Sequence, residues 1–211
     1  MNNATEYLMQ PPKAGKQEAT IYLIRHGDTA LNEIDSERVR GWSDVQLNMD
    51  GINAAHRITK FLMDKGVKNL YSSDLMRAVQ TADMIGYALN LTPKYDPDLR
   101  PWDVGVLAGQ ALPKVLSQLQ FYTESFPNEA VKGGESYQVF YDRAKKVIHN
   151  YIMKASQSNQ VLAVVTHSLM LHVVDNIITN GSKPVTYKSR VHPGGIIKLT
   201  LADRIVLKEV Y

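Results

Sequence analysis

The chain has 211 residues, of which 44% are hydrophobic and 21% charged, as in ordinary globular proteins. It contains no cysteine, which excludes a disulfide scaffold, a thiolate metal site and a cysteine nucleophile. The net charge of +3 is too small to indicate a nucleic-acid or membrane partner, and no apolar run reaches the roughly 20 residues of a transmembrane helix.

The first 19 residues are polar, contain Pro11-Pro12 and lack the apolar core of a secretory signal. We therefore expect an N-terminal extension over residues 1–19, a single domain over 20–211, and a cytoplasmic protein.

Strand and helix patterns then alternate along the chain. In order, they are a strand over 21–24, a polar loop over 28–48, a helix over 51–65, a strand over 69–72, a helix over 74–90 capped by Ser73, a helix over 113–122, a turn at 132–134, a helix capped by Ser136, a strand over 161–165, a helix from His167 to about Asn180, and strands over 196–199 and 205–210. This alternation predicts an α/β fold, a three-layer sandwich with a mostly parallel central sheet and helices on both faces.

Polar groups follow three of the predicted strands. Arg25-His26 ends the first strand, Arg77 lies one turn into the helix after Ser72-Ser73, and Thr166-His167 ends the Val-rich strand. Because ligands of such sheets bind beyond the carboxyl ends of the strands, we expect the two histidines and two arginines to lie together.

This combination suits a phosphate. Two guanidinium groups offer forked donors to phosphate oxygens, and the helix that starts near His167 adds backbone N–H groups. Nearby positive charge keeps an imidazole neutral, and a neutral imidazole can attack phosphorus to form a phosphohistidine.

Several ordered blocks of the sequence resemble the histidine phosphatase superfamily, which has the phosphoglycerate mutase-like fold. The resemblance runs from about residue 20 to the C-terminus, and ordered blocks are far more specific than a single RHG triplet. The blocks are Leu23–Thr29 with Asn32, Arg38–Asp44, Leu47–Gly51, Tyr71–Ala82, Gly133–Ser136 with Arg143, and Val164–His167.

The resemblance implies a role for individual residues. His26 would accept the phosphoryl group, Arg25 and Arg77 would bind its oxygens, and His167 would be the second histidine of the pocket. Asn32 would be a further phosphate contact. Ser168 would contribute a backbone N–H to the phosphate, although the family often has glycine there.

The expected proton donor is absent. The family usually has a glutamate where this chain has Pro101, and Asp103, beside Trp102, is the nearest replacement. An enzyme without an acid would need a good leaving group, such as a phenolate, an acyl phosphate or a phosphoramidate. The other candidate carboxylates for the phosphate site are Glu33, Asp35 and Glu135.

The loop arginines Arg38 and Arg40 are either solvated charges or substrate contacts, and the second interpretation is favoured for Arg38 only. Only 29 residues separate Asp103 from Gly133. The mutases of the superfamily carry a larger insertion there, so a phosphatase is favoured over a mutase.

The leading hypothesis is a cofactor-independent phosphatase that acts on a phosphorylated small molecule without a metal. Three alternatives stay open: a phosphoglycerate mutase-type phosphotransferase, a non-catalytic phospho-ligand binding protein, and a metal hydrolase using His26, His167, His172 and an aspartate. The substrate and the oligomeric state cannot be inferred from the sequence.

Overall fold

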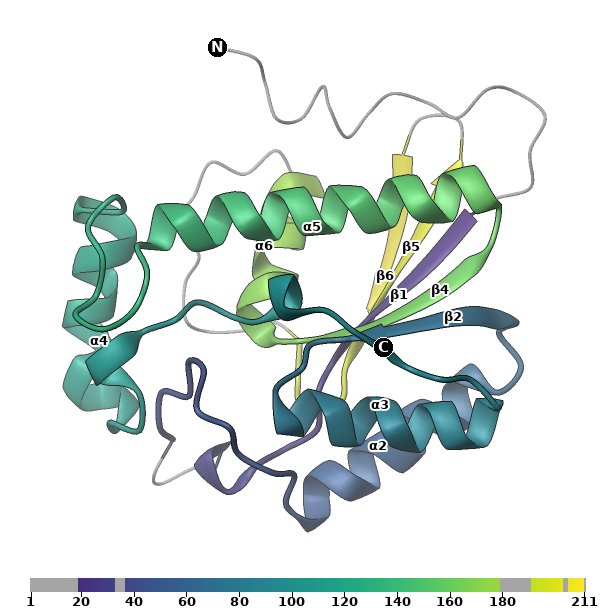
Figure 1. Ribbon diagram of the computed structural model, residues 1–211, viewed down its shortest axis with the longest axis horizontal. Coiled ribbons are helices and arrows are strands. Elements are labelled where there is room, and N and C mark those ends of the chain that lie inside the picture. Colours follow the sequence, from purple (N-terminus) through teal and green to yellow (C-terminus); the bar gives the residue numbers. More distant parts are fainter. Residues whose placement is uncertain (1–18, 33–36, 179–190, 203–204, 211) are drawn as a thin grey trace.

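The computed structural model describes residues 19–32, 37–178, 191–202 and 205–210, which form one α/β sandwich (Figure 1). Its six-stranded sheet has the order β3-β2-β4-β1-β5-β6. The strands are β1 (Ala19–Arg25), β2 (Val67–Ser72), β3 (Lys94–Tyr95), β4 (Val161–Thr166), β5 (Ile196–Ala202) and β6 (Ile205–Val210). Neighbours among β3, β2, β4 and β1 pair in parallel, whereas β5 pairs antiparallel with both β1 and β6. The predicted mostly parallel sheet is therefore confirmed.

Helices cover both faces of the sheet (Figure 1). On one face, α2 (Met49–Leu62) and α3 (Met76–Leu89) pack side chains such as Ile58 and Ile85 against Ile24 and Val165. On the other face lie α4 (Leu112–Gln120), the π-helical turn η4 (Phe121–Ser125), α5 (Tyr137–Ser158) and α6 (Ser168–Ile178). Short 3-10 turns lie at Ala30–Asn32, Pro97–Leu99 and Gly105–Leu107. The apolar spacing seen in the sequence thus marks the buried faces.

Side-chain caps fix where the helices begin. Asn48 accepts a hydrogen bond from the Gly51 N–H at the start of α2, and Ser136 accepts one from Val139 at the start of α5, as predicted. The predicted cap of α3 is wrong. Leu75 occupies that position, and the first N–H of the helix, at Met76, donates to the carboxylate of Asp44, 32 residues earlier in the chain.

The topology explains where a ligand can bind. Strands β1 and β4 are neighbours, with Arg25 paired to Thr166 at their carboxyl ends. The helix that follows β1 covers one face of the sheet, and the helix that follows β4 covers the other. The chain therefore departs in opposite directions from adjacent strand ends, which opens a crevice between them.

Two glycines bring α2 close to the end of β1. A Cβ at Gly27 would overlap the carbonyl oxygen of Gly51, and a Cβ at Gly51 would overlap that of Asp28. The first turn of α2 therefore rests directly on the backbone that follows His26.

Among the described residues, no helix is both long and apolar enough to cross a membrane. The extension predicted for residues 1–19 lies outside the described residues except for Ala19, which begins β1. The predicted helix end near Asn180 also lies outside them.

Candidate active site

A cavity of about 830 Å³ opens at the carboxyl ends of β1 and β4. Its volume is in the upper part of the range for small-molecule sites, roughly 300–1,000 Å³. The sequence-predicted residues Arg25, His26, Asn32, Arg77, His167 and Ser168 all line it. The structure therefore brings six of the seven predicted site residues together, and four of them, the two histidines and two arginines, are those that the strand-end argument placed there.

His26 is held in one orientation and in one tautomer. It is 2% exposed, and its Nδ1 lies 2.7 Å from the carbonyl oxygen of Gly27, so Nδ1 carries the proton and donates. Its Nε2 accepts a hydrogen bond of 3.2 Å from Nε of Arg77. Burial, followed by the charges of Arg77 and Arg25, holds the pKa of His26 well below its ordinary value. The ring is thus neutral, with its Nε2 lone pair toward a guanidinium group.

Arg77 is buried on α3 and is anchored by the loop before α2. Its Nη1 donates to the carbonyl oxygen of Ser43 over 2.7 Å, and its Nη2 donates to that of Gly41 over 3.0 Å. Burial, with a further contribution from Arg40, lowers the pKa of Arg77 to about 9. Arg77 is therefore a fixed cation at the floor of the cavity.

Arg25 is the second buried cation that the sequence predicted here. Its Nη1 donates to the carbonyl oxygen of Val191 over 2.7 Å, whereas its Nε is buried and makes no hydrogen bond in the described structure. Burial is the main reason that the pKa of Arg25 falls to about 10. An unsatisfied buried donor is costly unless a ligand supplies the acceptor.

His167 faces His26 from the end of β4. The two rings are 5.0 Å apart between centroids, at 63° to each other. Nε2 of His167 lies 2.8 Å from Oγ of Ser73, and its buried Nδ1 makes no hydrogen bond in the part of the chain that is described. Burial and the charge of Arg77 hold the pKa of His167 well below its ordinary value. The site therefore contains two neutral imidazoles among cations.

A third arginine joins these two, and the sequence had left open whether it is a solvated charge or a substrate contact. Arg40 lines the cavity, and its positive charge lowers the pKa of Arg25, Arg77 and both histidines. Its Nη1 donates to the carbonyl oxygen of Leu31 over 3.2 Å, and its side chain is 15% exposed. Arg38, which was favoured as the substrate contact, is exposed at the mouth and bonds the carbonyl oxygen of Gly109. Arg40 and Arg38 are distinguished only by burial. The sequence of a loop has no periodic pattern from which the burial of its side chains can be predicted.

Asp103 is the predicted site residue that the structure does not bring to the cavity. Its carboxylate accepts a hydrogen bond from the Gly105 N–H over 3.1 Å and so stabilises a turn. Trp102, which we expected to desolvate it, is wholly buried and donates its indole N–H to the carbonyl oxygen of Glu135. Pro101 lines the cavity where a proton donor was expected.

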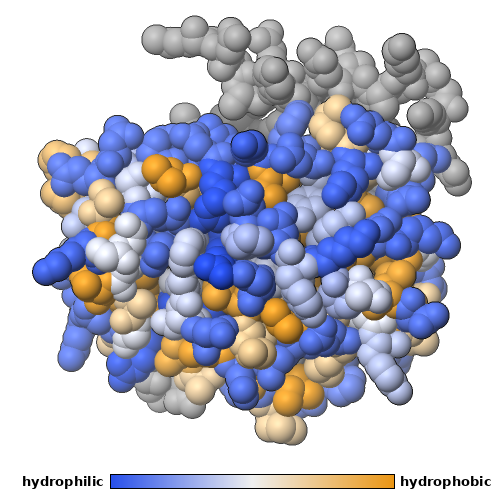
Figure 2. All heavy atoms as spheres, in the orientation of Figure 1, coloured by the Kyte–Doolittle hydropathy of each residue, from blue (hydrophilic) through white to orange (hydrophobic). Residues whose placement is uncertain are grey.

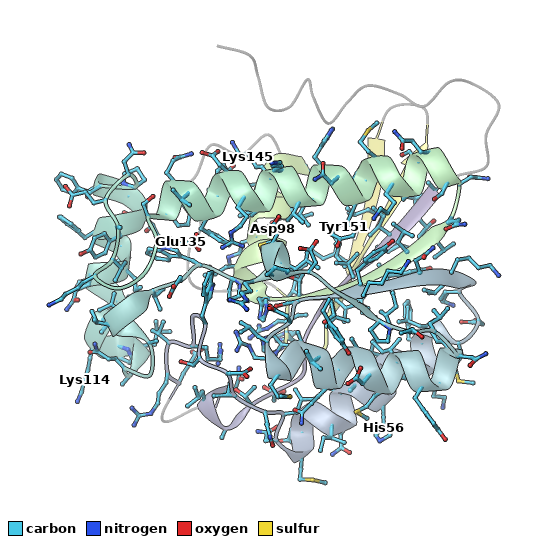
Figure 3. All side chains as sticks on the ribbon, in the orientation of Figure 1. His56, Asp98, Lys114, Glu135, Lys145 and Tyr151 are labelled. Carbon is cyan, nitrogen blue, oxygen red and sulfur yellow. The ribbon has the colours of Figure 1, made fainter. Side chains whose placement is uncertain are left out.

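The other carboxylates considered in the sequence do not fill this gap. Glu135 accepts hydrogen bonds from Arg143, over 2.6 Å, and from the Asp103 N–H (Figure 3). Glu33 and Asp35 lie outside the described residues. Asp28, Glu37 and Glu124 are the carboxylates in the described lining. Burial raises the pKa of Asp28.

Asn32 and Ser168, for which the sequence predicted smaller roles, also line the cavity. The amide oxygen of Asn32 accepts hydrogen bonds from both the N–H and the hydroxyl group of Thr29, which fixes the amide plane at the cavity. Ser168 begins α6, where backbone N–H groups have no partner within the helix. His172, by contrast, does not line the cavity, and no metal-binding group of three is found among the described residues.

The outer wall of the cavity differs from its floor. It is formed by one side of α4 and η4 through Leu112, Leu116, Gln120, Thr123 and Glu124, with Val39 and Val104 nearby. Lys114, on the same helix, is absent from the lining and extends outward (Figure 3). Outside the cavity, the face shown in Figure 2 is mainly hydrophilic with scattered hydrophobic residues.

A cavity with paired histidines and clustered arginines at the switch point of an α/β sheet defines a phosphoryl-binding protein. The sequence profile of the histidine phosphatase superfamily (branch 1) matches residues 21–206, and the chain belongs to this family. Members of the family are phosphatases or mutases.

Individual relatives include both kinds of protein. The chain is 29% identical over 155 residues to a protein of Proteus mirabilis (strain HI4320) named probable phosphoglycerate mutase GpmB, covering 72% of this chain and 70% of that protein. It has the same fold as a phosphoglycerate mutase from Bacillus anthracis, with a TM-score of 0.76, 24% identity and 93% of each chain covered. It also has the fold of a mycobacterial glucosyl-3-phosphoglycerate phosphatase, with a TM-score of 0.73, 20% identity, and 92% of this chain and 98% of that chain covered.

Proposed function

We propose that residues 20–211 form a cofactor-independent phosphatase domain that hydrolyses a small phosphomonoester through a phosphohistidine on His26. The observation that carries this proposal is the neutral His26 imidazole, whose Nδ1 donates to Gly27 and whose Nε2 lone pair meets the Arg77 guanidinium. A binding site alone needs cations but has no use for a preset nucleophile.

In the first step the phosphoryl oxygens bind Arg25, Arg40 and Arg77. A phosphate oxygen is a stronger acceptor for the Arg77 Nε–H than an imidazole is, so substrate binding frees the Nε2 lone pair. Nε2 then attacks phosphorus, and the bond to the leaving oxygen breaks. Because the guanidinium groups are buried and anchored, they stabilise the developing charge without reorganising.

In the second step a water molecule attacks the phosphorus of phospho-His26. The new P–O bond forms as the P–N bond breaks, and its electron pair returns to Nε2. His167, Asn32 and the N–H of Ser168 would bind the phosphoryl group in both steps. The product is inorganic phosphate.

Hydrolysis is favoured over a mutase reaction by the outer wall. A phosphoglycerate carries a carboxylate as well as a phosphate, and both must be bound for transfer between its hydroxyl groups. In the described lining, α4 and η4 contribute leucines and Glu124 but no cation. We expect the protein to act in the cytoplasm on a phosphorylated small molecule, with neither nucleic acid nor membrane as partner.

The test is turnover and trapping with His26→Ala as the matched variant. We expect the wild-type protein to release phosphate from p-nitrophenyl phosphate and to form an acid-labile, base-stable phosphoenzyme in a rapid quench. His26→Ala should lose both while still binding vanadate or phosphate. Turnover that survives in His26→Ala would contradict the mechanism.

A further inference from the structure

We propose that the substrate of this site is an aryl phosphate, a phosphate ester of a phenol-type hydroxyl group whose ring lies against the wall formed by Leu112 and Leu116. The proposal rests on the proposed function and adds the class of leaving group. Two independent features carry it: the carboxyl groups around the leaving-group position, and the apolar character of the outer wall.

The first feature is the set of groups near the leaving oxygen. In an in-line displacement the leaving oxygen lies opposite His26 Nε2, toward the outer part of the cavity. Pro101, which has no proton to give, lines the cavity and stands in the sequence where the family usually has its glutamate donor. Asp103 and Glu135, the neighbouring carboxylates, are bound to the Gly105 N–H and to Arg143.

The Pro101 segment is also fixed in place. Its carbonyl oxygen accepts hydrogen bonds from the indole N–H of Trp42, over 2.8 Å, and from Arg143, over 3.3 Å. Arg143 donates to the carbonyl oxygens of Asp98 and Arg100 as well. A movement that brings Asp103 into the cavity would break several of these bonds together.

The three carboxylates of the described lining are poorly suited to protonate that oxygen. Asp28 follows the nucleophile by two residues, and its charged neighbours are Arg25 and Arg40 of the inner end together with Asp50 and Arg57 of α2, so it lies on the nucleophile's side. Glu37 and Glu124 are exposed to solvent, and Glu37 lies 3.8 Å from the guanidinium of Arg40. Among the described residues none is placed to protonate the leaving oxygen, so the proposal requires a group that departs without a proton.

This requirement restricts the leaving group. A phenol has a pKa of about 10, close to that of a tyrosine side chain, whereas the pKa of an alkyl alcohol is far higher and resembles that of water. A phenolate departs as a stable anion near neutral pH, and an alkoxide does not. General acid catalysis normally contributes about 10²–10⁴-fold to such a step.

The second feature selects among good leaving groups. The carboxylate that an acyl phosphate releases and the amine that an alkyl phosphoramidate releases gain less from an apolar surface than a phenyl ring does. Beside the polar Gln120, Thr123 and Glu124, the lining presents Leu112 and Leu116 of the outer wall with Val39, Val104 and Leu169, around a volume far larger than a phosphate needs. An aromatic ring fills such a space with little loss of conformational entropy. The leucines of the wall and the lack of a placed acid among the described residues together favour a phenolate.

The balanced reaction needs no further reactant. His26 Nε2 forms a bond to phosphorus, the P–O bond to the ring breaks, and its electron pair leaves on the phenolate oxygen. Water then forms the new P–O bond, both of its protons end on the phosphate, and the P–N electron pair returns to Nε2.

The test compares two substrates of similar shape, phenyl phosphate and cyclohexyl phosphate. We expect kcat/KM for phenyl phosphate to exceed that for cyclohexyl phosphate by at least about 10²-fold, the contribution that an acid would otherwise make. Pro101→Glu, which introduces a carboxyl group into the lining, should raise the cyclohexyl phosphate rate. Asp103→Asn should leave the ratio of the two rates unchanged.

The apolar wall is tested separately. Leu116 is 38% exposed, so Leu116→Asp should fold, and we expect it to lower kcat/KM for phenyl phosphate about 10-fold. Val139→Asp, at an exposed position on α5 outside the lining, is the matched control and should change it less than about twofold.

The outcomes separate this inference from the proposed function. Comparable rates for both esters, lost in His26→Ala, would overturn the aryl phosphate assignment and leave the phosphatase intact. A rate ratio that rises in Asp28→Asn would identify Asp28 as a proton donor, with the same consequence. No turnover of either ester, with no phosphoenzyme, would overturn both.

Discussion

At its inner end the cavity is formed by strand ends whose histidines and arginines are almost wholly buried, whereas its outer wall is one side of α4 and η4. His26 and His167 are each 2% exposed, but Leu116 is 38% exposed. The inner groups are bound to backbone carbonyl oxygens of several different segments. The outer leucines belong to a helix that packs on the core through Val115 and Leu119, with Leu112 partly buried against it.

This difference in burial suggests that the inner end carries out the chemical step and that the outer wall determines which substrate is preferred. The positions of the inner groups follow from the register of β1, β2 and β4, which cannot shift without exposing the core. The outer side chains can change with little effect on folding. We therefore expect substitutions at the inner end to reduce turnover of every substrate, and those on the wall to change which substrate is preferred.

After the loss of turnover expected for His26→Ala, the largest effect at the inner end is expected from Arg77. Arg77→Met removes the donor to His26 Nε2 and the anchor to Gly41 and Ser43, so kcat/KM for an aryl phosphate should fall by about 2.7–4 kcal/mol, roughly 10²–10³-fold. Steady-state kinetics measure this, with exposed Lys60→Met on α2 as the control. A loss below tenfold would mean that the inner end tolerates substitution as the wall does.

Arg40 and Arg38 sharpen the comparison because they are two residues apart and differ in burial. Arg40→Gln should weaken inhibition by inorganic phosphate by about 1.5–3 kcal/mol, the usual value of a hydrogen bond to a charged group. Arg38→Gln, at the exposed mouth, should change it less than about threefold. Inhibition constants for phosphate provide the measurement, and equal effects of the two variants would show that burial does not separate them.

The smallest effect concerns pH and stability. Because the folded protein holds the pKa of His26 and His167 below the ordinary value, the unfolded state binds more protons in acid. Stability should therefore be full above about pH 6.5 and fall below it, by up to about 1.4 kcal/mol per pH unit for each histidine. Denaturant unfolding between pH 5 and 7 measures the slope. His167→Gln should remove about half of it, and an unchanged slope would contradict the assignment of neutral rings.

The fold and the inner end were accessible from the sequence because they depend on short-range patterns. The Val161–Val165 run and the helical spacing around Ile85 predict buried faces, and polar residues after parallel strands must meet at one edge. The hydrogen-bonded cap of α5 at Ser136 was visible for the same reason. Each of these signals is contained within a few residues.

The errors arise where distant segments decide the outcome. Asp44 caps α3 across 32 residues, so the local signal at Ser73 was misleading. Arg143 and Trp42 hold the Pro101 segment from two other parts of the chain, which turns Asp103 away from the cavity. Arg40 and Arg38 differ only in how the loop folds over them. No spacing in the sequence contains that information.

The close contact between Gly27 and Gly51 constrains the short segment after His26 for a structural reason, apart from catalysis. Neither glycine tolerates a side chain, because each Cβ would overlap the other segment's backbone. The two glycines are therefore required for α2 to pack on the end of β1, whether or not the adjacent imidazole takes part in a reaction. Descendants of this chain that abandon catalysis would be free to lose His26, but they would have to keep both glycines. Retention of the two glycines is therefore a marker of ancestry, whereas retention of the histidine is the marker of a working enzyme.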